Sequence, residues 1–253
     1  MEKIIDTPDL SPNPIPCPIC SSVTCLLPPV DLNKNCEERR GLNLPDSGVE
    51  IYYSYCPSCG FCFADSLHKK SPEWFKENVY NADYIIVDPE FENSRPVQNA
   101  KWLMQMLGNK KDVISHLDYG GGNGVLSKTL AENGWNSTSW DAFYDEERPL
   151  DSKKFNLITA FEVFEHVPDQ QALMKNIVSL MNEESVFLFS TLLSDGNLRA
   201  GERPDWWYAS PRNGHISLHS QKSLGVLMMN YKLLIKTRNA GVHMAYFKLP
   251  SWL

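Results

Sequence analysis

The sequence predicts a doubly wound, Rossmann-like α/β fold with a small cysteine-rich module at its N-terminus. From about residue 113 onward, segments with the pattern of buried strands alternate with amphipathic segments, which is the order of a sheet covered by helices on both faces. All seven cysteines fall within the first 62 residues, so a thiol-containing module precedes a thiol-free domain. A chain of 253 residues is long enough for both.

Four segments are expected along the chain, in this order: an extended, proline-rich lead-in (1–16), the cysteine module (17–70), a helical lid segment (71–110) and the α/β domain (111–253). In the module, residues 49–55 and 61–64 have the pattern of a β-hairpin. The lid segment opens with Ser71 as an N-cap and Pro72 at the first helical position.

The elements of the α/β domain follow from the hydrophobic pattern. Runs rich in β-branched and aromatic residues predict strands at 113–119, 138–143, 155–161 and 186–192. Amphipathic runs predict helices at 96–107, 126–133, 170–181 and 220–230. The last two segments, 231–238 and 243–248, are expected to pair as closing antiparallel strands.

Composition and charge argue against several classes of protein. With 24 basic and 31 acidic residues the chain carries a formal charge of −7, so we expect no nucleic-acid partner. The apolar run 186–193 is too short to span a bilayer, and residues 1–10 lack the apolar core of a signal peptide. An odd number of thiols argues against a disulfide framework. We therefore expect a cytoplasmic protein without a membrane partner.

A glycine-rich turn, Asp118-Tyr-Gly-Gly-Gly-Asn-Gly, follows the first strand of the α/β domain. Gly120, Gly122 and Gly124 have the spacing G-x-G-x-G, whereas a dinucleotide fingerprint needs its third glycine one residue later. The shorter spacing after an acidic residue is typical of enzymes that use S-adenosylmethionine (SAM). Asp118 is then expected to bind the amino-acid end of that cofactor.

Acidic residues also follow the next two strands. Asp141 comes about twenty residues after the glycine turn, where a carboxylate can accept hydrogen bonds from both ribose hydroxyls of an adenosyl group. The strand at 155–161 runs into the sequence FEVFEHVPD, which puts Glu162, Glu165 and His166 at its carboxyl end. Ligands bind at that edge of open α/β sheets.

Together these motifs resemble the class I SAM-dependent methyltransferases of the small-molecule type, over roughly residues 95–250. The resemblance implies a SAM-methyltransferase sheet, with Glu162 among the cofactor contacts. It also implies a lid over the cofactor that includes Tyr80 and Tyr84. The family usually has a further strand after the one at 138–143, where this chain has only a short segment.

Two C-P-x-C turns, Cys17 to Cys20 and Cys56 to Cys59, mark the N-terminal module. Four thiolates can hold one Zn²⁺ ion in a closed, tetrahedral, structural site. Cys62 offers an alternative pair with Cys59, but the repeated C-P-x-C pattern favours Cys56. A zinc-ribbon-like module before a SAM domain resembles the sugar C-methyltransferases and related glycan and small-molecule methyltransferases.

The loop after the strand at 186–192 carries three consecutive aromatic residues, Trp206, Trp207 and Tyr208. Aromatic faces stack well on sugar rings and planar molecules, so these residues are expected to line the acceptor site. His215 follows and aligns with the histidine that serves as base in the sugar C-methyltransferases. The residue before it is Gly214, where those enzymes have an acidic side chain.

The sequence therefore predicts SAM-dependent methyl transfer to a small-molecule acceptor, a sugar or glycan-precursor metabolite. His215 is the favoured general base, and His166 and Glu165 are expected in the same pocket. Two alternatives stay open. Glu162, Glu165, His166 and His215 could instead hold a divalent ion, as in the 2′-O-methyltransferases of small-RNA 3′ ends. The fold could also be a non-catalytic SAM-binding module.

Overall fold

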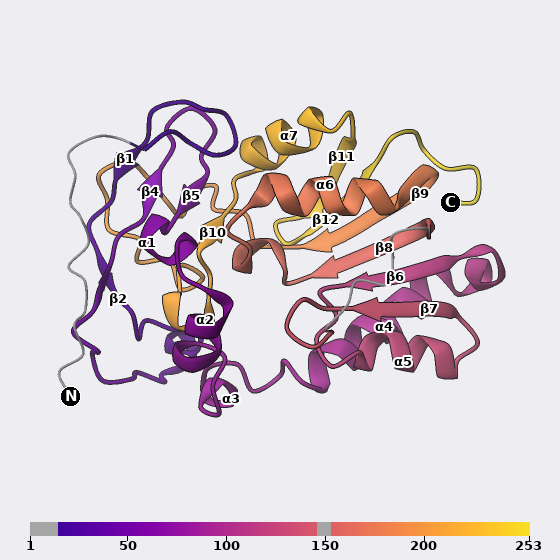
Figure 1. Ribbon diagram of the computed structural model, residues 1–253, viewed down its shortest axis with the longest axis horizontal. Coiled ribbons are helices and arrows are strands. Elements are labelled where there is room, and N and C mark those ends of the chain that lie inside the picture. Colours follow the sequence, from indigo (N-terminus) through magenta and orange to yellow (C-terminus); the bar gives the residue numbers. More distant parts are fainter. Residues whose placement is uncertain (1–14, 146–152) are drawn as a thin grey trace. The chain divides into compact units, whose positions relative to one another are not determined.

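The computed structural model describes residues 15–145 and 153–253 (Figure 1). Most of the expected lead-in (1–14) and residues 146–152 lie outside this part, including most of the segment where the methyltransferases usually have their further strand. The described chain forms two compact units. The first takes the residues up to Val87 with Glu165–Asp169 and Leu193–Val226, and the second takes Asp88–Phe164, Gln170–Leu192 and Leu227–Leu253. Each unit joins separate stretches of sequence, unlike the consecutive boundaries expected above.

The first unit is built on short antiparallel strands. Its four-stranded sheet has the order β1 (Cys25–Leu26), β4 (Ser54–Tyr55), β5 (Cys62–Phe63), β10 (Ser217–Leu218), and a separate pair joins β2 (Val30–Asp31) to β3 (Glu50–Ile51). The hairpin of β4 and β5 lies where the pattern of residues 49–64 predicts one. The pairing of β5 with β10 joins residues far apart in the sequence.

The helical elements of this unit are α1 (Asp65–His68), α2 (Pro72–Asn78), α3 (Tyr84–Val87) and two 3₁₀ turns, Cys36–Arg40 and Pro211–Asn213. α2 begins as its sequence predicts: the Ser71 hydroxyl accepts a hydrogen bond from the Trp74 amide at 3.2 Å, and Pro72 occupies the first helical position. This cap satisfies one of the amide groups that a helix leaves open at its start.

The second unit contains a six-stranded mixed sheet. Its order is β11 (Leu234–Asn239), β12 (Val242–Tyr246), β9 (Met181–Ser190), β8 (Phe155–Phe161), β6 (Ser115–Tyr119), β7 (Asn136–Trp140). β9, β8, β6 and β7 run parallel to one another, and β12 and β11 close the sheet antiparallel. The predicted Rossmann-like α/β fold is confirmed.

Helices α4 (Ser94–Leu107), α5 (Val125–Glu132) and α6 (Gln170–Leu180) belong to this unit, with the 3₁₀ turn Gly108–Val113. α7 (Gln221–Asn230) and the 3₁₀ turn Phe164–His166 cross the boundary between the units. In Figure 1, α5 lies along β7 and α6 along β9. Leu103 of α4 and Leu130 of α5 are fully buried with Leu157 of β8 in one core. Burying each such leucine contributes about 1.5–3 kcal/mol.

Several strand limits differ from those predicted, and the largest differences are in β7 and β9. β7 ends at Trp140 because Asp141 turns the chain: its carboxylate accepts the Phe143 amide at 2.8 Å and its carbonyl accepts the Asp145 amide at 2.9 Å. β9 begins at Met181, five residues before its predicted start. The prediction missed these residues because most of them are polar and lack the apolar pattern of a buried strand. Among the described residues, none of the helices is long and apolar enough to cross a membrane.

Candidate active site

The glycine loop between β6 and α5 is hydrogen-bonded to the end of β7. The amides of Gly120 and Gly121 donate to the Trp140 carbonyl at 2.7 and 3.3 Å. The Gly122 amide donates to Asp141 Oδ2 at 2.9 Å. Three glycines of the loop have positive φ angles of 56° to 76°, a region that costs glycine nothing: Gly120, Gly122 and Gly124.

The two sides of this loop differ in the room that they leave. A Cβ at Gly121 would lie 2.3 Å from Ser139 Oγ and 2.5 Å from Asp118 Oδ2, so packing requires a glycine that the spacing motif did not select. A Cβ at Gly122 would meet no protein atom within 4 Å. The open side at Gly122 therefore has space for a cofactor against bare backbone.

Asp118, at the end of β6, is 3% exposed. Burial raises the pKa of this carboxyl to about 7, and the negative charge of Asp141 adds to the rise. A hydrogen bond from the Thr159 hydroxyl to Asp118 Oδ1, at 2.8 Å, acts in the opposite direction. A buried carboxylate with so high a pKa is suited to a cationic ligand such as the ammonium group of SAM.

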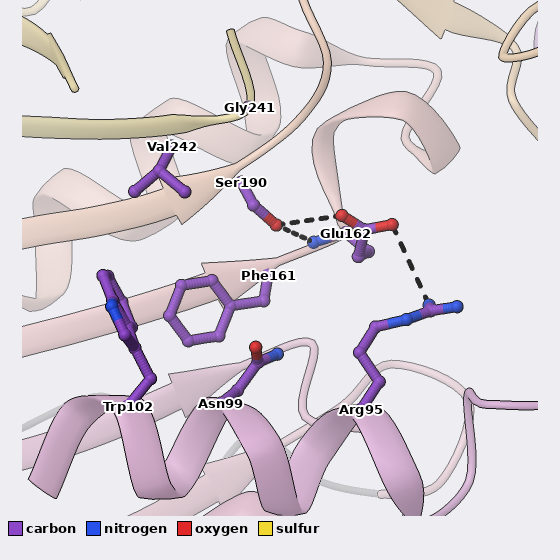
Figure 2. A pocket seen from close by; sticks show the side chains of 8 residues that line it. All are labelled: Arg95, Asn99, Trp102, Phe161, Glu162, Ser190, Gly241 and Val242. Atoms are coloured by element: carbon purple, nitrogen blue, oxygen red, sulfur yellow. Dashed lines mark hydrogen bonds and ion pairs between the residues drawn. The ribbon is translucent and has the colours of Figure 1, made fainter. Parts of the chain in front are cut away.

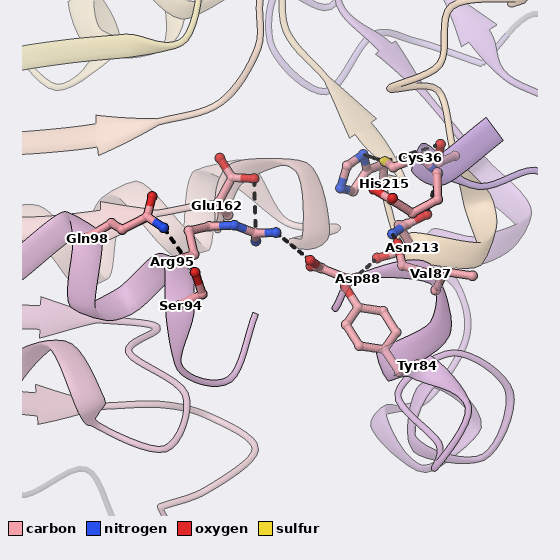
Figure 3. A network of polar contacts seen from close by, with 12 residues as sticks. Cys36, Tyr84, Val87, Asp88, Ser94, Arg95, Gln98, Glu162, Asn213 and His215 are labelled. Atoms are coloured by element: carbon pink, nitrogen blue, oxygen red, sulfur yellow. Dashed lines mark hydrogen bonds and ion pairs between the residues drawn. The ribbon is translucent and has the colours of Figure 1, made fainter. Parts of the chain in front are cut away.

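Glu162 follows β8 with a φ of 56°, an uncommon angle for a residue with a side chain. Its amide donates to Ser190 Oγ at 2.9 Å, and the same hydroxyl donates to Glu162 Oε1 at 3.1 Å. Arg95 of α4 lies between two carboxylates: it pairs with Asp88 and lies 3.8 Å from Glu162 Oε2 (Figure 3). The bonds to Ser190 hold the strained residue in place.

A pocket of about 230 Å³ opens beside these residues, at the carboxyl ends of β8 and β9 (Figure 2). Trp102, Phe161 and Val242 form its apolar side, and the two aromatic rings meet edge to face at 6.1 Å. Its other lining residues are Arg95, Asn99, Glu162, Ser190 and Gly241. Of the lining residues, the sequence motif contains Phe161 and Glu162, whereas Arg95 and Asn99 lie on a helix that carries no motif.

In the first unit, Glu165, His166 and His215 lie together. One side-chain ligand atom of each lies within 4.8 Å of the others. The two imidazole rings are 5.0 Å apart and nearly perpendicular. The sequence predicted that these three residues share a pocket.

Tyr208 orients two members of this cluster. His215 Nδ1 lies 2.8 Å from the Tyr208 carbonyl, which can only accept, so Nδ1 carries a proton and the lone pair of the neutral ring is on Nε2. The Tyr208 hydroxyl donates to Glu165 Oε1. Cys36 Sγ lies 3.8 Å from the same nitrogen of His215 (Figure 3).

His166 Nδ1 lies 3.0 Å from the Tyr80 hydroxyl and 3.2 Å from the Gly214 carbonyl. A Cβ on Gly214 would lie 2.6 Å from the same hydroxyl, so a side chain at this position would displace Tyr80. Tyr84 is buried, and its hydroxyl donates to the Asn213 carbonyl at 3.3 Å. The proposed lid role of Tyr84 stays a prediction.

The three consecutive aromatic residues differ in exposure. Tyr208 is 2% exposed and its hydroxyl is used by Glu165. Trp206 and Trp207 are half-buried, and the Arg39 guanidinium lies 4.0 Å from the centre of a Trp207 ring. The tryptophans, rather than Tyr208, therefore keep exposed ring surface, and Arg39 already covers part of it at Trp207.

The family of proteins described as methyltransferase domains matches residues 91–233. The chain belongs to this family. Ubiquinone biosynthesis O-methyltransferase of Coxiella burnetii is 31% identical over 115 residues, 36% of this chain and 48% of the relative. The enzyme of that name from Actinobacillus pleuropneumoniae is 27% identical over 104 residues, 30% of this chain and 44% of the relative. The chain thus spans about half the length of the curated relatives it matches.

Solved structures of methyltransferases are similar at low identity. One is magnesium protoporphyrin IX methyltransferase from Synechocystis PCC 6803 with S-adenosylhomocysteine (SAH) bound, which is 15% identical with a TM-score of 0.39. The match covers 59% of this chain and 81% of the chain of that enzyme. The plantazolicin methyltransferase in complex with a monoazolic desmethylPZN analog and SAH is 11% identical with a TM-score of 0.48. The match covers 72% of this chain and 94% of the chain of that enzyme.

In this methyltransferase-domain protein, four cysteine sulfurs also form a cluster in the first unit. Sγ atoms of Cys17 and Cys59 are 3.6 Å apart, those of Cys20 and Cys56 are 3.5 Å apart, and all four lie within 4.8 Å. Sulfurs bound tetrahedrally to one Zn²⁺ at about 2.3 Å would be roughly 3.8 Å apart. Cys62, the alternative, is buried on β5 and is not part of the cluster. The donor set fits a structural zinc ion.

The first prediction concerns this cluster. Elemental analysis should find about one zinc per chain, and Cys56→Ser should release it and unfold the N-terminal module, because a closed site of four thiolates supplies folding energy. Cys36→Ser, outside the cluster, is the matched control and should keep the metal. A zinc-free wild type with a normally folded N-terminus would contradict the assignment.

The second prediction concerns Asp118. Its pKa in the folded protein, about 7, is above that of an unfolded aspartate, so ionisation destabilises the fold increasingly from about pH 4 up to pH 7. Asp118→Asn removes this cost. Its advantage in unfolding free energy over wild type should grow by about 3 kcal/mol between pH 5 and pH 8, as measured by urea titration. An advantage independent of pH would show that Asp118 is not the group that titrates.

The third prediction uses the open side of the glycine loop. Gly122→Ala adds a methyl group that meets no protein atom, so the fold should survive with only the cost of a positive φ, about 1 kcal/mol. SAM binding, measured by calorimetry, should be lost because the methyl group occupies the space for the cofactor. Gly134→Ala, at another positive φ in the same unit, should bind SAM normally. Unchanged affinity in Gly122→Ala would remove this loop from the cofactor site.

Proposed function

We propose that this protein transfers a methyl group from SAM to a small-molecule acceptor, with a histidine as general base. Membership in the methyltransferase-domain family supports the reaction class. The observation that carries the cofactor assignment is the open backbone at Gly122, flanked by the carboxylates of Asp118 and Asp141. When bound, SAM supplies a sulfonium methyl group that is open to nucleophilic attack.

Each cofactor residue has a distinct part in this proposal. Asp118 pairs with the ammonium group of the methionine portion, which removes the cost of its buried charge. Asp141 uses the remaining lone pairs of its carboxylate for the ribose hydroxyls, since each oxygen accepts one backbone amide and has capacity for a second bond. Glu162 belongs to the same edge of the sheet and lines the pocket beside it.

His215 is the proposed base. Its Nδ1 proton is committed to the Tyr208 carbonyl, so the basic lone pair of the neutral ring is on Nε2, the atom that we propose takes the proton of the acceptor. A carboxylate near the imidazole, here Glu165, stabilises the imidazolium that forms. His166 lines the same pocket, with Tyr80 fixing its ring.

The acceptor proposed is a sugar or glycan-precursor metabolite. The half-buried faces of Trp206 and Trp207 support a ring-shaped acceptor, because aromatic side chains stack on sugar rings. The matched relatives are named for O-methylation in ubiquinone biosynthesis, which is likewise methyl transfer to a small molecule.

A second candidate is metal-assisted methyl transfer. Glu165, His166 and His215 offer one carboxylate oxygen and two imidazole nitrogens within 4.8 Å, a donor set that suits a divalent ion. Such an ion would bind and acidify an acceptor hydroxyl. The formal charge of −7 argues against RNA as the acceptor, and the intact glycine loop argues against a non-catalytic binding module.

The fourth prediction separates these two mechanisms. His215→Asn keeps a side chain of similar size without its basic nitrogen, so turnover should fall about a hundredfold or more while SAM affinity stays near that of wild type. His166→Asn should lose less. The readout is methyl transfer from radiolabelled SAM to a panel of sugar nucleotides and hydroxylated small molecules.

His68→Asn is the matched control, because His68 is a half-buried histidine of the same unit outside the cluster. The reverse ranking of the two variants would move the base to His166. Loss of wild-type activity on chelation that leaves zinc on the four cysteines, restored by added Mn²⁺, would favour the metal-assisted mechanism instead.

A further inference from the structure

A continuous chain of polar side chains, of which all but the half-buried Ser137 are buried, crosses the parallel sheet of the second unit. We call it the buried relay: Ser127, Ser137, His116, Thr159 and Asp118. Ser127 Oγ is 2.8 Å from Ser137 Oγ, which is 2.7 Å from His116 Nδ1. His116 Nε2 is 2.9 Å from Thr159 Oγ1, and that hydroxyl donates to Asp118 Oδ1 at 2.8 Å. The relay ends on the carboxylate proposed to bind the cofactor.

The register of the strands brings these residues together. His116 pairs with Ser137 of β7, and Asp118 pairs with Thr159 of β8. His116 and Asp118 are two residues apart on β6, so their side chains share one face of the sheet. Central strands of a parallel sheet are usually apolar, which makes a histidine with both nitrogens bonded to hydroxyls an unusual occupant.

The relay has one direction when Asp118 is ionised. A carboxylate can only accept, so the Thr159 hydroxyl donates its hydrogen bond to Asp118. Thr159 Oγ1 must then accept the hydrogen bond from His116, which puts the imidazole proton on Nε2. His116 Nδ1 consequently accepts from Ser137, and every proton in the chain points toward Asp118.

The imidazole in this chain is neutral near pH 7. His116 is completely buried, and burial lowers its pKa to about 3. The charged group that bears on Asp118 is Asp141, whose negative charge raises the pKa of Asp118, and the Thr159 bond is the contact that lowers it. Without the relay, the pKa of Asp118 would rise further and less of it would be ionised at pH 7.

We propose that His116 and Thr159 are positioning residues for cofactor binding, which keep Asp118 ionised and turn its second oxygen toward the glycine loop. Asp118 Oδ2 faces this loop, since a Cβ on Gly121 would lie 2.5 Å from it. The inference rests on the proposed function, in which Asp118 binds the ammonium group of SAM. Neither positioning residue needs to touch the cofactor.

Thr159→Val tests the relay, because valine has the shape of threonine without its hydroxyl. The probe is SAH, titrated calorimetrically from pH 6 to pH 9. SAH affinity should decrease as the pH is lowered and Asp118 becomes protonated. Loss of a hydrogen bond to this charged group should raise the midpoint of that decrease by about 1 to 2 pH units. Binding should be roughly tenfold weaker at pH 7 and recover by pH 9, and Thr159→Ser should restore the wild-type profile. An unchanged pH profile in Thr159→Val overturns the proposal.

His116 gives a second test. His116→Leu should weaken SAH binding at pH 7, whereas His116→Gln, whose amide N–H can replace the Nε2 proton, should retain most of it. His243→Leu is the matched control: His243 is also fully buried in this sheet and is bonded at both nitrogens, to Thr237 and to the Thr191 carbonyl. Equal loss of SAH affinity in both leucine variants would reduce His116 to a packing role.

Imidazole nitrogen NMR of the free protein needs no cofactor. At pH 8.5 the proton of His116 should be on Nε2, and a proton on Nδ1 would mean that the relay runs away from Asp118 and would overturn the inference. The two proposals fail differently. Wild-type protein that binds no SAH at any pH rejects the proposed function and the relay with it, whereas normal wild-type binding with unaltered variants rejects the relay alone.

Discussion

The attachment of the glycine loop to the end of β7 is the interaction on which the proposed cofactor site depends. The Trp140 carbonyl accepts the Gly120 amide, and Asp141 accepts the Gly122 amide. These bonds connect the exits of two neighbouring parallel strands, so the backbone of the loop cannot move without disturbing β7. Asp141 thereby has two tasks: it ends its own strand and it fixes the neighbouring turn.

Much of the second unit could be predicted from the sequence because its signals are local. The strand Phe155–Phe161 has its predicted limits, since a run of apolar residues is bounded by lysines before it and an acidic residue after it. The glycine spacing gave the loop between β6 and α5. The spacing could not show that position 121 also needs a glycine. A side chain there would collide with Ser139 and Asp118, and only the strand register brings these two residues next to Gly121.

The first unit was harder to predict because its contacts are non-local. The repeated C-P-x-C turns identify the four cysteines that gather, and the two histidines were expected in one pocket. The partners that orient them were not evident: Tyr208 is an aromatic residue in a loop, and nothing in its neighbourhood in the sequence indicates a hydroxyl bonded to Glu165. Likewise, no local pattern predicts that β10 pairs with β5.

The interleaving of the two units in the sequence has a consequence for biosynthesis. The cysteine turns and β5 leave the ribosome well before β10, the strand that completes their sheet. The backbone groups of β5 that later pair with β10 therefore stay unpaired while most of the second unit is synthesised. A metal ion captured early by the thiols would give the nascent module order during this interval, before its last strand exists. Synthesis speed and zinc supply would then both influence how much chain escapes aggregation.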